Sequence, residues 1–123
     1  MKKVLIEKVP EIKEGLKAKR WREEKGEFVQ IAYNEGMRHL AIFEIRKGFT
    51  RGSHYHERKE EIFYVVSGRM EAKFIDMDTH QRKDSILMRG DKIWIKPRCS
   101  PLFQALVYRF IKILTYEPFS KPL

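Results

Sequence analysis

The sequence contains a single cysteine, no long apolar run and no signal-peptide pattern at its start. Because Cys99 has no partner in the chain, an internal disulfide is excluded, which suits a reducing cytoplasm. No apolar run approaches the roughly 20 residues that a transmembrane helix needs. The first residues, M-K-K-V-L-I-E, meet a charge before any signal-peptide apolar region develops. We therefore expect a cytoplasmic protein without a membrane partner.

Acidic residues are also in short supply, because 17 Asp and Glu stand against 26 Lys and Arg, for a net charge of +9. Such a surface attracts anions, whether nucleic acid, phosphorylated small molecules or acidic lipids. The basic and aromatic cluster at 19–22 is the candidate for nucleic acid, but Glu23 and Glu24 follow it directly and no groove-reading motif is present. We expect no nucleic-acid partner and interpret most of the interleaved charge as a solvated surface.

A long amphipathic helical pattern is missing as well, and short β patterns take its place. Apolar residues are sparse between 11 and 27 and glycines interrupt them, so we expect an irregular arm there. From residue 28 onward, aromatic and β-branched runs alternate with turns that contain Gly or Pro, including a loop at 96–101. This pattern is typical of an all-β sandwich or barrel. The expected strands are 4–9, 28–33, 40–45, 61–67, 70–76, 85–88, 93–95, 103–107 and 110–116.

The stretch 48–68 concentrates the residues that carry chemistry. His54 and His56 are separated by one residue, and Glu61 follows five positions later. In a strand, residues two apart point to the same face, so an H-x-H sequence places two imidazoles side by side. Two histidines and one glutamate form the facial set that suits a divalent transition metal with open positions. The spacing predicts a three-ligand metal site.

This stretch resembles the first motif of the cupin superfamily, G-x5-H-x-H-x4-E-x6-G. The fixed positions of that motif are met by Gly48, His54, His56, Glu61 and Gly68. The resemblance implies a double-stranded β-helix, the cupin-type jelly-roll barrel, which belongs to the double-sheet all-β architectures.

The second cupin motif, G-x5-P-x-G-x2-H-x3-N, is degenerate in this chain. Gly90 matches its opening, but Lys96, Arg98, Pro101 and Ala105 stand where the family has Pro, Gly, His and Asn. Proline cannot bind a metal, so the usual fourth protein ligand is missing. The chain resembles a cupin with one motif intact and the other lost.

The resemblance also implies how the chain divides. A chain of 123 residues fits one domain and can bury a real core. We expect a single cupin domain over 1–123, with the core barrel at 28–116. The N-terminal strand and charged arm are expected at 1–27, and a tail at 117–123.

The cofactor implied is a divalent metal ion, which is Zn, Mn, Fe or Ni. Its protein ligands are His54, His56 and Glu61, with Glu60 as the neighbouring substitute if the chain bends differently. Three ligands can still hold such an ion, with water or substrate on the open positions. Cys99 is close enough in sequence to supply a soft fourth ligand, but we favour a buried, inert thiol.

The sequence R-G-S-H-Y-H at 51–56 resembles the corresponding segment of the small cupins of sugar-nucleotide and polysaccharide biosynthesis. Related R-G-x-H text occurs in deoxysugar ketoisomerases and 3,5-epimerases, whose histidine acts as the base, and by position His54 is that base. The resemblance implies an isomerase or epimerase of carbohydrate metabolism that acts on a keto-sugar nucleotide. Such a reaction needs a base for the proton α to the carbonyl and a group, Arg51 or a metal, that stabilises the enolate.

A histidine that ligates a metal cannot abstract a proton through the same nitrogen. If the metal binds His54, the base is another group, such as Tyr64, Tyr108 or a metal-bound hydroxide. His39 and His80 are expected at the surface. Two alternatives stay open: a metal-dependent oxygenase or lyase on a small carbonyl compound, and a non-catalytic ligand-binding module. The module is favoured if four aromatic side chains fill the barrel and leave no cavity: Phe63, Phe74, Trp94 and Phe103.

The expected partners are a small phosphorylated or nucleotide-sugar ligand and a second copy of the chain. The candidate diphosphate ligands are Arg51, Arg69, Lys73 and Arg98. We expect a homodimer because an N-terminal strand is available for exchange and because outward positions on the strand 61–67 are apolar. These positions are Ile62, Tyr64 and Val66.

Overall fold

The computed structural model describes residues 1–106 and 111–118, and within these ranges the chain forms eleven strands and no helix. The all-β class expected from the sequence is confirmed. No helical segment of the described ranges is therefore long and apolar enough to cross a bilayer. The strands are β1 (Val4–Lys8), β2 (Lys19–Glu23), β3 (Gly26–Gln30), β4 (Met37–Ile45), β5 (Thr50–Gly52), β6 (Glu61–Ser67), β7 (Arg69–Asp76), β8 (Arg82–Met88), β9 (Asp91–Ile95), β10 (Cys99–Ala105) and β11 (Ile111–Pro118).

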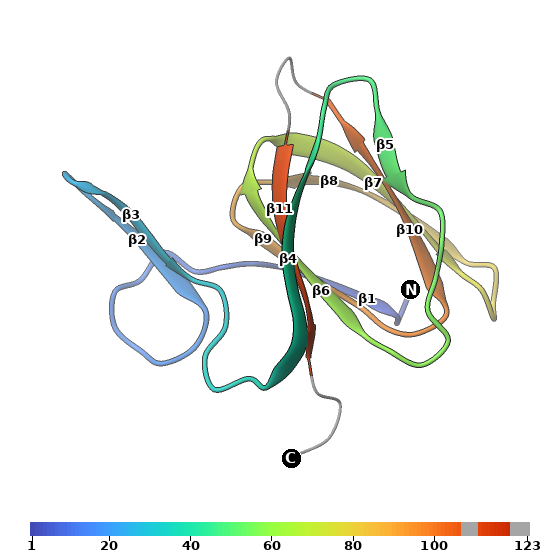
Figure 1. Ribbon diagram of the computed structural model, residues 1–123, viewed down its shortest axis with the longest axis horizontal. Helices are drawn as coiled ribbons and strands as arrows, with labels where there is room; N and C mark the ends of the chain where they lie inside the picture. Colours follow the sequence, from blue (N-terminus) through green and yellow to red (C-terminus); the bar gives the residue numbers. More distant parts are fainter. Residues whose placement is uncertain (107–110, 119–123) are drawn as a thin grey trace.

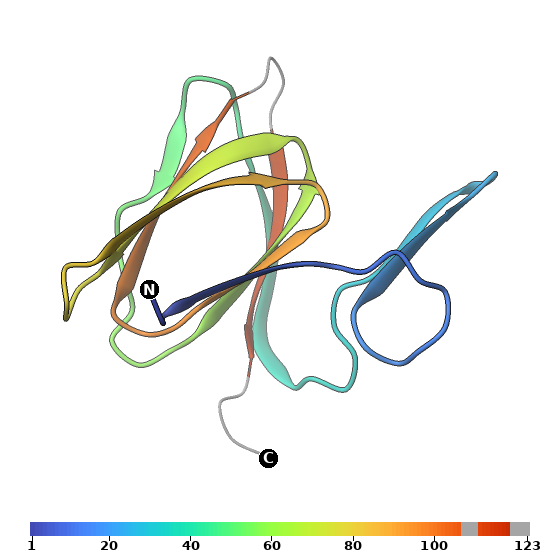
Figure 2. The ribbon, with the colours of Figure 1, turned by 180° about the vertical axis from the view of Figure 1, so that it is seen from behind.

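Two antiparallel sheets face each other and enclose the core. One sheet has the order β1-β9-β6-β11-β4 and the other has the order β5-β10-β7-β8. Consecutive strands repeatedly cross between the sheets, as β4 and β5 or β9 and β10 do, which is the pattern of a jelly roll. The hairpin of β2 and β3 stands apart from this barrel in both views (Figure 1, Figure 2). β1 belongs to the barrel, because it pairs with β9 along its whole length.

The space between the sheets is filled by alternate side chains from both. Phe63 of β6 and Phe74 of β7 each pack edge-on against Phe103 of β10, with ring centroids 5.2 and 6.3 Å apart. Phe74 and Phe103 are almost fully buried, so truncating either to Ala would cost about 3–5 kcal/mol. Cys99 is also part of this core, in agreement with the buried thiol expected from the sequence.

The outer face of the five-stranded sheet is also apolar, and the chain covers part of it. Ile62 and Tyr64 are buried although they point away from the core. The segment before β4 lies over this face: Lys92 donates a 2.8 Å hydrogen bond to the Ile31 carbonyl. Trp94 lies on the same outer face, since its neighbours in β9 point into the core. Trp94 therefore does not fill the barrel, and the four-aromatic packing that would favour a non-catalytic module does not form.

Two other expectations about local structure are corrected. The arm at 11–27 is irregular only up to β2, because β2 and the first two residues of β3 belong to a hairpin. Trp21 and Phe28 stack across the hairpin with ring centroids 4.3 Å apart, a contact that apolar spacing alone does not reveal. The loop expected at 96–101 is shorter, because β10 begins at Cys99 and Pro101 lies inside it. A proline fits there because the ladder between β10 and β5 ends at the pair of Leu102 and Gly52, one residue short of Pro101.

The strands β4 and β5 matter most for function, because each is the edge strand of its sheet and they lie on the same side of the barrel. A tight turn joins them, closed by a 3.0 Å hydrogen bond from the Phe49 N–H to the Arg46 carbonyl. Gly48 within the turn has φ +87°, a conformation that glycine adopts without strain. Within residues 1–106 and 111–118 no strand ladder joins these two edges, and we call the line between them the seam.

Candidate active site

A cavity of about 480 Å³ lies between the two sheets behind this seam. We call it the interior cavity. Its volume is within the range of about 300–1,000 Å³ that small-molecule sites occupy. Its apolar floor includes Phe43, Phe63 and Phe103, which leave space between the sheets, so the filled barrel that would have favoured a non-catalytic module is not observed. The lining residues are His39, Ala41, Phe43, Arg51, Gly52, His54, Glu61, Phe63, Pro101, Phe103 and Thr115.

His54 reaches this cavity because the chain bends sharply at the end of β5. Gly52 has φ +117°, and a Cβ there would overlap the carbonyl oxygen of Pro101, so only glycine fits. The next residue, Ser53, also has a positive φ of 63°, and its N–H donates a 2.7 Å hydrogen bond to the same carbonyl. The strand therefore ends before the two histidines. The expectation that H-x-H lies in a strand is wrong, and a bend brings His54 inward instead.

The three predicted metal ligands are neighbours but do not form a metal-binding group. The rings of His54 and His56 lie 5.4 Å apart between centroids. His56 Nε2 contacts Glu61 Oε1 at 2.5 Å, so these two side chains already satisfy each other. Among the described residues, no three His, Cys, Asp or Glu side chains are arranged to hold a metal ion. As arranged, this donor set does not fit a metal, and metal binding stays a prediction.

Glu60, the substitute ligand, points elsewhere. Its carboxylate accepts a 2.6 Å hydrogen bond from Lys96 Nζ. Cys99 is buried in the core and does not line the interior cavity, and burial raises the pKa of its thiol. Neither residue therefore adds a ligand to the predicted set.

Arg51 lies at the seam and connects the two edge strands. Its Nε–H donates a 3.1 Å hydrogen bond to the Glu44 carbonyl of β4, and its guanidinium carbon lies 5.5 Å from the centre of the Phe43 ring. Of the four predicted diphosphate ligands, Arg51 lines the interior cavity. Arg69 is exposed at the start of β7. Lys73 does not line the interior cavity, and its Nζ lies 3.6 Å from the Glu71 carboxylate.

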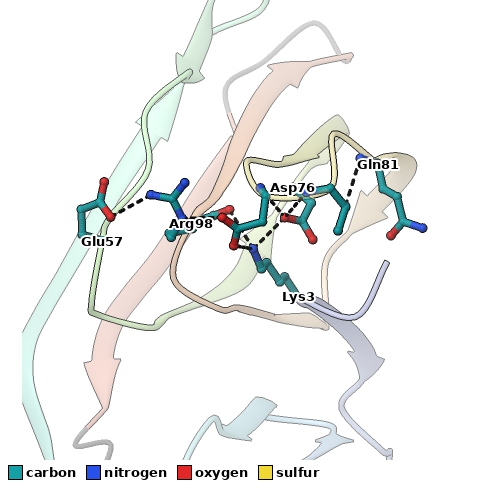
Figure 3. A network of polar contacts seen from close by, with 7 residues as sticks. Lys3, Glu57, Asp76, Gln81 and Arg98 are labelled. Carbon is teal, nitrogen blue, oxygen red and sulfur yellow. Dashed lines mark hydrogen bonds and ion pairs between the residues drawn. The ribbon is translucent and has the colours of Figure 1, made fainter.

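Arg98, the fourth of these cations, is used within the chain. Its guanidinium bonds Asp78 at 2.7 Å and Glu57 at 2.9 Å, and these hydrogen bonds raise the pKa of Arg98 (Figure 3). The residue has φ +61°, a conformation that favours glycine, and it stands at the position where the second cupin motif has glycine. Arg98 therefore holds the loop that contains the histidines rather than a ligand.

The candidate base Tyr64 does not lie in the interior cavity. Residues alternate along β6, so Glu61 and Phe63 face inward while Tyr64 faces the opposite side of the sheet. It is 2% exposed, and burial raises the pKa of its hydroxyl. Its proposed role as a base is corrected by this placement. The other candidate, Tyr108, falls outside the described residues.

Two cavity residues were not expected from the sequence. His39 is exposed, as predicted, but it also lines the interior cavity from β4, and Thr115 lines it from β11. The signal that would have found His39 is the alternation of β4, because positions 39, 41 and 43 share the inward face. His80 lies in the turn after β7, is exposed and does not line the interior cavity.

Residues 21–95 match the family model of the polysaccharide biosynthesis C-terminal domain, which is more than half of the chain. The chain belongs to this family. The matched range runs from the β2–β3 hairpin to the end of β9 and includes the complete first motif. No curated protein matches this chain by sequence.

Solved structures resemble the chain over almost its whole length. The TDP-quinovose 3,4-ketoisomerase WlaRB from Campylobacter jejuni is 16% identical, with a TM-score of 0.74 over 99% of this chain and 89% of its own. The sugar 3,4-ketoisomerase QdtA from Thermoanaerobacterium thermosaccharolyticum, in complex with TDP, is 16% identical, with a TM-score of 0.72 over 98% and 83% of the two chains. The dTDP-6-deoxy-D-glucose-3,5-epimerase RmlC from Legionella pneumophila Philadelphia 1 is 16% identical, with a TM-score of 0.69 over 86% and 66%. At these identities the likeness shows the fold, which is the cupin-type jelly roll expected from the first motif.

Proposed function

We propose that this chain is an isomerase or epimerase that acts on a keto-sugar nucleotide, with His54 as the base. The observation that carries the proposal is the interior cavity, in which an exposed imidazole and a guanidinium line the same apolar space. The family match and the fold shared with TDP-sugar ketoisomerases and a 3,5-epimerase support the same chemistry. A neutral histidine titrates near physiological pH, which suits a general base.

The reaction begins when His54 removes the proton on a carbon next to the sugar carbonyl. The C–H electron pair forms a C=C bond, and the carbonyl oxygen becomes an enolate. In an epimerase, the same carbon then takes a proton on its other face. In a ketoisomerase, the carbon that loses the proton carries a hydroxyl. The enolate oxygen takes up a proton and becomes a hydroxyl, the original hydroxyl gives up its proton and becomes the new carbonyl, and a proton is added to the former carbonyl carbon.

The enolate needs a donor on the wall opposite His54. His54 follows β5 of the four-stranded sheet, whereas His39 and Thr115 line the cavity from the five-stranded sheet. Their imidazole N–H and hydroxyl are the donors available to a developing oxyanion or to the second proton transfer. The aromatic floor limits water around the enolate, which strengthens these hydrogen bonds.

His56 contacts Glu61, and His54 takes no part in that contact. The ring of His54 lies edge-on to the ring of His56, with centroids 5.4 Å apart. His54 also makes no hydrogen bond to a residue in 1–106 or 111–118. Its ring nitrogens are thus open to a substrate, as a base requires. The proposed reaction uses no metal, because the donor set is not arranged for one. The oxygenase or lyase alternative would need the predicted metal site to form.

The proposal is tested by hydrogen exchange, because both reactions must break the same kind of C–H bond. TDP-4-keto-6-deoxyglucose is incubated with the protein in D₂O, and deuterium at the carbons next to the carbonyl is followed by NMR. We expect enzyme-dependent incorporation, and we expect His54→Gln to slow it by about a thousandfold. His80→Asn is the matched control: an exposed histidine is replaced by a residue that tolerates its positive φ of 63°.

Incorporation at the uncatalysed rate, with the nucleotide shown to bind, would favour a non-catalytic ligand-binding module instead. If the wild-type protein exchanges the proton and His54→Gln does so equally fast, the base is a different group, and His39 becomes the next candidate.

A further inference from the structure

A second hollow adjoins the interior cavity at the open seam. We call it the turn hollow; its volume is about 310 Å³, and it lies at the turn between β4 and β5. Among the residues that the structure describes, only Arg51 lines both spaces. The lining residues of the turn hollow are Glu44, Ile45, Arg46, Phe49, Thr50 and Arg51.

The guanidinium of Arg51 lies at the boundary between the two spaces. Its Nε–H donates to the Glu44 carbonyl on the opposite edge, which holds the side chain across the seam. No carboxylate within residues 1–106 and 111–118 forms an ion pair with it, and the residue lines both hollows. A planar fork of N–H donors with a fixed position matches the oxygens of a phosphate or diphosphate. A ligand that occupies both hollows must therefore carry its negative charge in the middle.

Phe49 gives the turn hollow an aromatic surface. The side chain is 68% exposed although the residue sits in an ordered turn, closed by its own N–H to the Arg46 carbonyl. The fold holds the backbone of this residue and leaves its aromatic ring exposed, so the ring is available to a ligand. Nucleobases stack on such rings with little dependence on sequence or on base type.

We propose that the turn hollow binds the nucleobase end of the substrate, with the base stacked on Phe49. The diphosphate then crosses Arg51, and the sugar enters the interior cavity beside His54. This inference rests on the proposed function and adds the direction in which the nucleotide lies along the seam. Arg46 and Glu44, which lie 3.9 Å apart as an exposed ion pair, also line the turn hollow, so their charges largely offset each other and Arg51 remains the cation for the diphosphate.

The test compares two ligands by isothermal titration calorimetry: TDP, which has a base, and inorganic pyrophosphate, which has none. We expect Phe49→Ala to weaken TDP binding about tenfold, since base stacking on an aromatic ring contributes about 1–3 kcal/mol. Pyrophosphate binding should not change. Phe49→Trp should keep the TDP affinity, and Arg51→Gln should weaken both ligands.

Ile86→Ala is the control for loss of an exposed apolar side chain, because Ile86 is 45% exposed on β8 of the other sheet. It should leave both affinities unchanged. If the wild-type protein binds TDP and Phe49→Ala binds it equally well, the base lies elsewhere, while the proposed function stands. If the wild-type protein binds neither ligand, the proposed function fails, and this inference fails with it.

Discussion

The backbone N–H of Arg98 donates a 2.8 Å hydrogen bond to the carbonyl oxygen of His56. The same residue extends its guanidinium to Glu57, the next residue along, at 2.9 Å. One residue of the β9–β10 loop thus fixes the histidine loop through main chain and side chain together. Asp78 holds the other side of the guanidinium and also accepts a 2.6 Å hydrogen bond from Lys3, which ties the network to the start of β1 (Figure 3).

Replacing Arg98 should separate its backbone role from its side-chain role. Arg98→Ala and Arg98→Gly both remove the guanidinium, but only glycine accepts φ +61° without strain. We expect Arg98→Gly to be more stable than Arg98→Ala by about 1 kcal/mol in urea unfolding. The lost surface ion pairs themselves should contribute little, since exposed pairs are worth about 0–1 kcal/mol. Equal stability of the two variants would contradict the role assigned to the backbone.

The acid stability of the protein should depend on Lys3. Its hydrogen bond to Asp76, 2.6 Å long, together with backbone N–H donors, holds the pKa of Asp76 well below its usual range, and the pKa of Asp78 is lowered in the same way. A carboxylate with a depressed pKa in the folded state contributes stability above its unfolded pKa of about 4 and loses it as the pH falls further. The wild-type protein should therefore lose stability below about pH 4.

The measurement is the urea midpoint at pH 7 and at pH 3. Lys3→Met should lower the urea midpoint at pH 7 and reduce the difference between the midpoints at pH 7 and pH 3. Lys2→Met is the matched control, because Lys2 is exposed and pairs with neither aspartate. If Lys3→Met and Lys2→Met give the same pH dependence, the depressed pKa values do not arise from Lys3.

Metal binding should be weak and dependent on the two histidines. His56 and Glu61 must leave each other before they can ligate an ion, so the purified protein should carry a sub-stoichiometric amount of divalent metal, restored by added Zn²⁺ or Mn²⁺. Elemental analysis after dialysis measures this. The double change His54→Ala with His56→Ala should abolish uptake, and Cys99→Ala should not alter it. No metal after reconstitution would defeat the prediction.

A homodimer, if it forms, should use the exposed part of the outer sheet face. Ile62 and Tyr64 are covered within the chain and Val66 is half-buried. The argument for a dimer from apolar outward positions on β6 is therefore weakened. Leu40 and Ile42 on the edge strand β4 are instead 61% and 62% exposed. We expect Ile42→Glu to produce a monomer in light scattering at micromolar concentration.

The control for this experiment is Ile86→Glu, which places the same charge on an exposed position of the other sheet and should leave the dimer intact. A wild-type protein that is monomeric at micromolar concentration would rule the dimer out.

The first motif made the fold predictable, because its glycines and the strand 61–67 have strong local signals. β6 occupies the expected residues, and β4, β7 and β9 differ from the expected bounds by only a few positions. The β2–β3 hairpin was missed because it depends on the stacking of Trp21 on Phe28, which pairs residues from two strands. Tyr64 was named as a base although the alternation of the strand 61–67, which places it outward with Ile62 and Val66, already separated it from Glu61.

The sequence by itself determined the jelly-roll class and the presence of His54, Arg51 and Glu61 at one site, because residue identity and fixed spacing are local properties. Only the tertiary structure decided what that site is. The bend at Gly52 brings His54 inward, the pairing of His56 with Glu61 takes up two predicted ligands, and His39 and Thr115 arrive from the opposite sheet. These relations depend on how two sheets pack across an open seam, which is set by contacts between residues far apart in the chain.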